Sequence, residues 1–195
     1  MPIIVALGGI PAVGKTTLVK QFFYNYKNWK EFKYKKLYGH YNEELNLIIL
    51  GKYSDNQLFS GTDKLSMAVQ PDFEDFIDKE KPPYNILFEG DRLFNVKTLQ
   101  KVKDNMSLQV YIVTSNNTKQ RHIDRKDSQS AKFIKSRVTK IENIKIFLNK
   151  DYMTLINNKE QDIKENYNII VNNFYSKGKR GLWQDQRSIK LTHPN

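Results

Sequence analysis

Eight consecutive residues near the start of the chain, Gly9 to Thr16, read Gly-Ile-Pro-Ala-Val-Gly-Lys-Thr, the types and spacing of a phosphate-binding loop. Glycines at both ends of such a loop permit backbone angles that a side chain would block, so the amide hydrogens can turn inward around an anion. In this pattern the lysine, Lys15, reaches the β and γ phosphates of a nucleotide, and the hydroxyl of Thr16 is a ligand of Mg²⁺. The sequence thus predicts binding of ATP with Mg²⁺. The residues expected to contact the nucleotide are Gly9, Ala12, Val13, Gly14, Lys15, Thr16 and Thr17.

Two carboxylates and an arginine directly follow the apolar stretch 85–88. Phosphoryl transfer needs acidic groups near the metal and near the hydroxyl that accepts the phosphate. We expect Asp91 to be the catalytic base on the acceptor side and Glu89 to lie closer to the metal. The reverse assignment also fits the sequence, as does a solvated pair of acids in a turn. Arg92 is expected either to bind an acceptor phosphate or to pair with a nearby acid.

A polar run between residues 60 and 64 supplies further candidates for the acceptor pocket, namely Ser60, Thr62 and Asp63. Asp63 is the third candidate for the catalytic base. A helix is expected to begin here, so a capping role for Thr62 or Asp63 is the competing interpretation.

Arginine is scarce in this chain, with 6 arginines against 26 lysines, and four of the six lie between residues 92 and 137. A guanidinium binds phosphate oxygens in a bidentate geometry that lysine cannot match. Arg121 and Arg125 are four residues apart and would share a helix face. We expect residues 117–131 to form a basic lid whose arginines, with Arg137 on the next helix, close over the nucleotide and exclude water. The alternative is a solvated charged helix.

The elements that must position these residues can be inferred from the apolar patterning. Strands are expected at 3–7, 36–38, 47–50, 85–88, 108–113 and 167–171, and helices at 15–25, 63–79 (possibly bent at Pro71), 96–103 and 132–150. Their alternation predicts an α/β fold with a parallel β-sheet sandwiched by helices. Ligands bind at the carboxyl edge of such sheets, where the candidate residues fall. We expect one domain over residues 1–195, ending in a basic tail from about residue 176 to 195.

Composition excludes several other classes of protein. The 195 residues contain no cysteine and three histidines, which argues against disulfide scaffolds, thiol nucleophiles and multi-histidine metal centres. The longest apolar run is too short to span a membrane, and no signal peptide precedes it, so we expect a cytoplasmic protein without a membrane partner. The segment 114–119 lacks the guanine-reading pattern Asn-Lys-x-Asp of GTPases.

Three further runs resemble phage-encoded P-loop nucleotide kinase-like proteins, including the 5-hydroxymethyldeoxyuridine DNA kinases of phage thymidine hypermodification. These runs are 50–53 (LGKY), 59–71 (FSGTDKLSMAVQP) and 88–93 (FEGDRL), and the resemblance covers roughly residues 3–145. It implies a P-loop NTPase fold of the nucleoside or nucleotide kinase type, acting in the cytoplasm of a phage host. Arg121, Arg125 and Arg137 would be lid residues by position. Lys64 stands where we would expect arginine in this family, which weakens a bidentate role there.

Three functions follow as competing hypotheses. In the first, the enzyme transfers the γ-phosphate of ATP to the 5-hydroxymethyl group of hydroxymethyluracil in DNA, as the resemblance implies. The net charge of +11, the lysine-rich stretch 27–36 with its three aromatic residues, and the basic tail would then contact DNA. In the second, the acceptor is a free nucleoside monophosphate or nucleoside. In the third, the protein is a nucleotide-gated nucleic-acid-binding protein without transferase activity. The sequence does not indicate an oligomeric state.

Overall fold

The computed structural model describes residues 2–53, 60–124 and 129–175. Within these residues, six α-helices flank one seven-stranded sheet with the strand order β2-β3-β4-β5-β1-β6-β7. The strands are β1 (Ile3–Gly8), β2 (Lys30–Tyr34), β3 (Leu37–Asn42), β4 (Leu47–Leu50), β5 (Asn85–Glu89), β6 (Ser107–Thr114) and β7 (Met153–Ile156). The helices are α1 (Lys15–Asn25), α2 (Gln70–Asp75), α3 (Val96–Asn105), α4 (Thr118–Asp124), α5 (Ala131–Leu148) and α6 (Glu160–Tyr175). The predicted α/β class is confirmed.

The sheet is mixed rather than wholly parallel. Strands β4, β5, β1, β6 and β7 run parallel, so their carboxyl ends meet at one edge, whereas β2 and β3 pair antiparallel with their neighbours. Only residues 35–36 separate β2 from β3, and such short turns can join only antiparallel strands. The lysine-rich stretch 27–36, for which only residue 36 was predicted to be in a strand, therefore contains the edge strand β2.

One predicted strand is wrong. Residues 167–171 lie within helix α6, and the last described strand is β7. Along α6 the buried side chains are Asn166, Ile170 and Asn173, spaced by four and three residues as on one face of a helix. The β-branched run 169–171 suggested a strand. The helical pattern was hidden because two of the three buried side chains of α6 are asparagines rather than apolar residues.

The helix predicted at 63–79 is also divided. Residues 62–64 form a single 3₁₀ turn, η1, and α2 begins only at Gln70 before continuing into a π-helical turn, η2 (Phe76–Glu80). Pro71 lies in the first turn of α2, where its missing N–H breaks no helical bond, so it starts the helix rather than bending it. The helices predicted at 15–25, 96–103 and 132–150 are confirmed as α1, α3 and α5 to within two residues.

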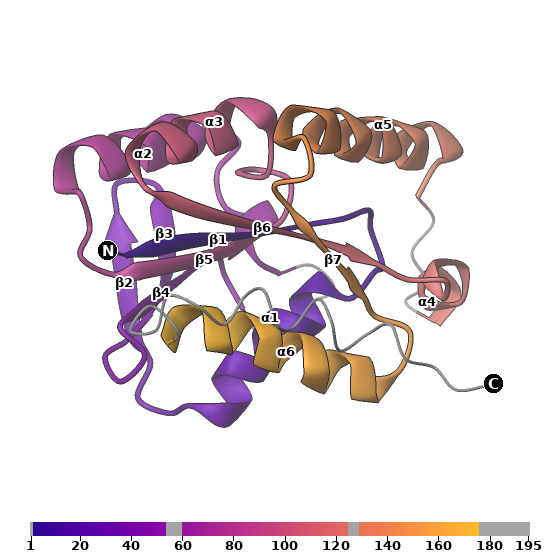
Figure 1. The fold of residues 1–195 in the computed structure, drawn as a ribbon, viewed down its shortest axis with the longest axis horizontal. Coiled ribbons are helices and arrows are strands. Elements are labelled where there is room, and N and C mark those ends of the chain that lie inside the picture. The colour runs from indigo at the N-terminus through magenta and orange to yellow at the C-terminus, as the bar shows by residue number, and fades with distance from the viewer. Residues whose placement is uncertain (1, 54–59, 125–128, 176–195) are drawn as a thin grey trace.

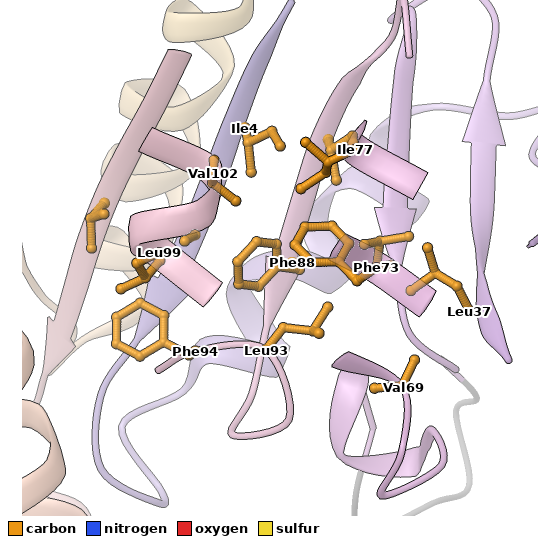
Figure 2. Close-up of a cluster of buried hydrophobic side chains, with 14 of the residues drawn as sticks. Ile4, Leu37, Val69, Phe73, Ile77, Phe88, Leu93, Phe94, Leu99 and Val102 are labelled. Carbon is orange, nitrogen blue, oxygen red and sulfur yellow. The ribbon is translucent and has the colours of Figure 1, made fainter. Parts of the chain in front are cut away.

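Two hydrophobic cores lie on the two faces of the sheet. Helices α2, α3 and α5 cover one face, and α1 and α6 cover the other (Figure 1). Successive residues of β1 therefore alternate between the cores, with Ile4 in the first and Val5 in the second. Figure 2 shows part of the first core, in which the rings of Phe73 and Phe88 pack edge to face. Their ring centroids are 5.5 Å apart. Within the described residues, no helix is long and apolar enough to cross a membrane.

Candidate functional site

The glycine loop, residues 9–14, connects the end of β1 to the start of α1 at the carboxyl edge of the sheet. Its backbone has positive φ angles at Gly9 (140°), Ala12 (62°) and Gly14 (91°). A Cβ on Gly14 would collide with the side-chain amide of Asn157, and a Cβ on Gly9 would collide with the carbonyl oxygen of Val113. The two glycines of the sequence pattern are therefore required both by backbone angle and by neighbouring atoms.

Lys15 is the first residue of α1, and its side chain folds back over the glycine loop. The Nζ atom donates hydrogen bonds to the carbonyl oxygens of Gly9 (2.9 Å) and Ile10 (3.1 Å). An ammonium group beside a helix N-terminus makes this end of the sheet attractive to an anion.

Thr16 and Glu89 connect the loop to the neighbouring strand. The hydroxyl of Thr16 donates to Glu89 Oε1 at 2.8 Å, because β5 lies next to β1 with Glu89 opposite Leu7. Glu89 is only 2% exposed. Burial raises the pKa of its carboxyl to about 7, helped by the negative charges of Asp63 and Asp91 and opposed by Lys15 and the Thr16 hydrogen bond.

Segment 60–64 lies against the end of β5, and hydrogen bonds join the segment to Glu89 and Asp91. Thr62 is fully buried and its hydroxyl donates to the Glu89 carbonyl oxygen at 2.7 Å. Asp63 Oδ1 accepts a hydrogen bond from the Asp91 amide at 2.7 Å. The side chain of Asp63 is solvent-accessible, yet partial desolvation, followed by the Asp91 charge, raises its pKa. Ser60 is buried as well.

Neither Thr62 nor Asp63 caps a helix, so the capping interpretation of these two residues is wrong. The residue before η1 is Gly61, and no side chain accepts a capping hydrogen bond there. A Cβ on Gly61 would collide with the Glu89 carboxylate, which shows how closely this segment approaches the acid.

Asp91 is held by two cations of α5. Lys140 Nζ lies 3.3 Å from Asp91 Oδ1 and 3.0 Å from the Asp91 carbonyl oxygen. Arg137 Nε lies 3.0 Å from Asp91 Oδ2, an ion pair in which the Nε–H is not aligned for a hydrogen bond. The Arg137 guanidinium also stacks over the ring of Phe133, 4.5 Å from its centroid. The Nε atom of Arg92, the residue after Asp91, is buried and has no hydrogen-bond partner in the part of the chain that the structure describes.

Arg121 contacts the glycine loop from a different element, α4. Its Nη1 donates to the carbonyl oxygen of Ala12 (3.2 Å) and its Nη2 to that of Asn157 (2.9 Å). Arg121 and Arg137, both predicted as lid residues, therefore contact separate groups: Arg121 contacts the loop and Arg137 contacts Asp91. Arg125 and the tail 176–195 lie outside the described residues.

Two site residues were missed from the sequence. Lys140 was not among the predicted site residues, although it contacts Asp91. Asn157 directly follows β7, and its side-chain Nδ2 donates to the Val13 carbonyl oxygen at 2.8 Å. Asn157 could have been recognised as a polar residue at the carboxyl end of a strand, but β7 itself was not predicted.

The aromatic residues of stretch 27–36 do not form one exposed stack. Trp29 packs on Phe23 of α1 with ring centroids 4.7 Å apart. Phe32 and Tyr34 pack instead on Phe76, at 5.3 and 5.1 Å. Phe32 and Tyr34 are two residues apart on β2 and therefore share one face of the sheet, whereas Trp29, just before β2, packs against the core on the other face.

The carboxylates do not form a preformed metal cage. Within the described residues, no group of three or more His, Cys, Asp or Glu side chains could hold a metal ion by itself. The Thr16–Glu89 pair still fits Mg²⁺, which uses few protein oxygens and takes its other ligands from phosphates and water.

Comparison of the chain with protein-family models finds no match, and comparison with curated proteins finds no similar protein.

Proposed function

We propose that this protein is a P-loop kinase that transfers the γ-phosphate of ATP to a hydroxyl group. The observation that carries the proposal is the contact of Thr16 with Glu89 directly beside a glycine loop that carries Lys15. This contact places a hydroxyl, a buried acid and an ammonium at one helix N-terminus, which are the parts that phosphoryl transfer uses.

Each residue then has a definite role in binding. The loop amides and Lys15 bind the β and γ phosphates, and Thr16 and Glu89 would hold Mg²⁺, which neutralises phosphate charge when bound. Burial raises the pKa of Glu89, and the charge of a bound cation would offset this by favouring its ionised form.

Asp63 is our candidate for the base. Its carboxylate is accessible and has a raised pKa, whereas both oxygens of Asp91 face cations. In the proposed step, the acceptor hydroxyl gives its proton to Asp63 as its oxygen bonds to the γ-phosphorus. The bond from that phosphorus to the β–γ bridging oxygen breaks, and ADP leaves. Asp91 would then hold Arg137 and Lys140 near the transferring group.

The acceptor we propose first is the hydroxymethyl group of hydroxymethyluracil in DNA. The resemblance of segments 59–71 and 88–93 to the phage kinases supports it, since the two segments meet: Thr62 bonds to Glu89, and Asp63 bonds to Asp91. A free nucleotide or nucleoside is the second candidate, favoured by the packing of the half-buried rings of Phe32 and Tyr34 on Phe76, which leaves less of each ring to stack on bases.

The deciding experiment incubates the protein with γ-labelled ATP and Mg²⁺ and offers hydroxymethyluracil-containing DNA, plain DNA and nucleoside monophosphates in separate reactions. Label on the modified DNA alone supports the first acceptor, and label only on monophosphates supports the second. Phosphate release without labelling of any acceptor would contradict the kinase. Lys15→Ala should abolish transfer in every case.

The Asp63 assignment has its own comparison. Asp63→Asn should lower kcat by about 10²–10⁴-fold, as expected for a lost general base, while the affinity for ATP stays within a few-fold. Asp91→Asn should retain more activity than Asp63→Asn. The opposite ranking would return the base role to Asp91.

A further inference from the structure

We propose that Asn157 is a positioning residue for nucleotide binding, acting with Arg121 to hold the glycine loop in its anion-binding conformation. This inference rests on the proposed function, because it concerns how the same loop binds phosphate.

The two side chains hold consecutive carbonyl groups of the loop. Asn157 Nδ2 donates to the Val13 carbonyl oxygen at 2.8 Å, and Arg121 Nη1 donates to that of Ala12 at 3.2 Å. Arg121 is in turn fixed by the backbone carbonyl oxygen of Asn157. The backbone N–H of Asn157 donates to the Thr114 carbonyl oxygen at 2.9 Å. The loop is thereby tied to the ends of β6 and β7.

Holding these carbonyls sets the direction of the loop's amide hydrogens. In a trans peptide unit the C=O of one residue and the N–H of the next point in opposite directions. The Ala12 carbonyl is fixed toward Arg121 and the Val13 carbonyl toward Asn157, so the N–H groups of Val13 and Gly14 point the other way. These are the amides that a phosphate would need.

The packing around Asn157 points to a role beyond general stability. The side chain is 1% exposed, and its Oδ1 atom is buried without a hydrogen-bond partner among the described residues. Such an atom is costly and uncommon in proteins. The Nδ2 atom also occupies the space that a Cβ on Gly14 would need, so the amide and the glycine are matched to each other.

The test compares Asn157→Asp and Asn157→Ala with the wild type. Asn157→Asp keeps the size of the side chain but loses the donor, so both variants should bind Mg·ADP about tenfold more weakly, the effect of one well-placed hydrogen bond. In the transfer assay both should raise the KM for Mg·ATP by a similar factor with kcat within about twofold, the pattern of lost ground-state binding. Isothermal titration and steady-state kinetics measure these effects.

Asn166→Ala is the matched control. Asn166 is also buried, and its Nδ2 donates to the Ile156 carbonyl oxygen at 2.8 Å, but it does not touch the loop. This variant should lose thermal stability and keep the wild-type Kd for Mg·ADP. Equal weakening in Asn166→Ala and Asn157→Ala, or wild-type affinity in Asn157→Asp, would overturn the positioning role. A wild-type protein that fails to bind Mg·ADP would instead refute the proposed function.

Discussion

Glu89 exchanges a proton close to neutral pH, and this has consequences for both stability and activity. Its pKa is about 7 in the folded chain, mainly because of burial, against about 4.5 in an exposed peptide. The folded state therefore binds more protons than the unfolded state between these two values. The stabilising contribution of protonated Glu89 is complete below about pH 4.5 and is lost as the pH rises through about 7.

Glu89→Gln should remove this dependence. We expect the free energy of unfolding of the wild type, relative to that of Glu89→Gln, to fall by up to about 3 kcal/mol between pH 4.5 and 8, the equivalent of the pKa difference. Urea unfolding at several pH values measures it. Parallel curves for the two proteins would mean that Glu89 does not titrate in this range.

Thr62 offers a second prediction at the scale of one side chain. Thr62→Val keeps the shape but removes the hydrogen bond to the buried Glu89 carbonyl oxygen, and should cost about 1–3 kcal/mol in unfolding free energy. The more exposed Thr139, whose hydroxyl bonds only to its own helix, provides the control Thr139→Val. A cost no larger than that of the control would show that Thr62 does not anchor segment 60–64.

Individual roles were the least predictable part of the site. Glu89, Asp91 and Asp63 could be recognised as a group because strand ends converge at one edge of a parallel sheet. Their separation into a buried acid, an ion-paired acid and an accessible acid depends on Thr16, Arg137 and Lys140, which are distant in sequence. Spacing along the chain carries no information about those partners.

At the scale of elements, α5 carries the cations Arg137 and Lys140, and α3 positions the segment after β5 that they contact. Residue 95 is the N-cap of α3: its side chain accepts from the Thr98 amide at 3.0 Å and donates to Gln70 Oε1 at 3.2 Å, joining α3 to α2. Because residues 90–94 connect β5 to this cap, the cap also fixes where Asp91 lies.

Asn95→Ala should cost about 1 kcal/mol or somewhat more, the usual effect of losing an N-cap. Asn105→Ala, at the exposed far end of the same helix, is the control and should change little. Thermal unfolding followed by circular dichroism measures both, and equal costs would argue against the capping role.

Elements were predicted well where burial was continuous. β1 and β5 are buried over most of their length, and β6 is buried at residues 110–113, so all three read as apolar runs and their positions followed from the sequence. β7 has only Leu155 buried, and α6 turns Asn166 and Asn173 inward, so neither gives the usual pattern. Tertiary packing decided these two elements.

At the scale of the whole molecule, stability rests on two cores divided by the sheet. Phe73→Ala removes a fully buried ring from the core in Figure 2 and should cost about 3–5 kcal/mol. Ile146→Ala, at a residue 77% exposed, should change the free energy of unfolding by less than about 0.5 kcal/mol. Denaturant titration measures both, and a small loss in Phe73→Ala would indicate that the core rearranges to fill the space.

The net charge of +11 also leads to a prediction for the entire chain. If DNA is the acceptor, its KM should rise steeply with salt concentration, because binding a polyanion releases counterions. The KM for a free nucleotide should respond far less. A DNA KM that does not change between low and physiological salt would remove the charge argument for a polymeric acceptor.

The hydrogen bond from Asn157 to Val13 joins residues 144 positions apart. During synthesis, the glycine loop emerges from the ribosome long before its partner does. Until β7 and the residue after it have been translated and have docked, Ala12 and Val13 lack the contacts that orient their peptide groups. A nascent chain would therefore bind nucleotide at full affinity only after residue 157 has left the exit tunnel.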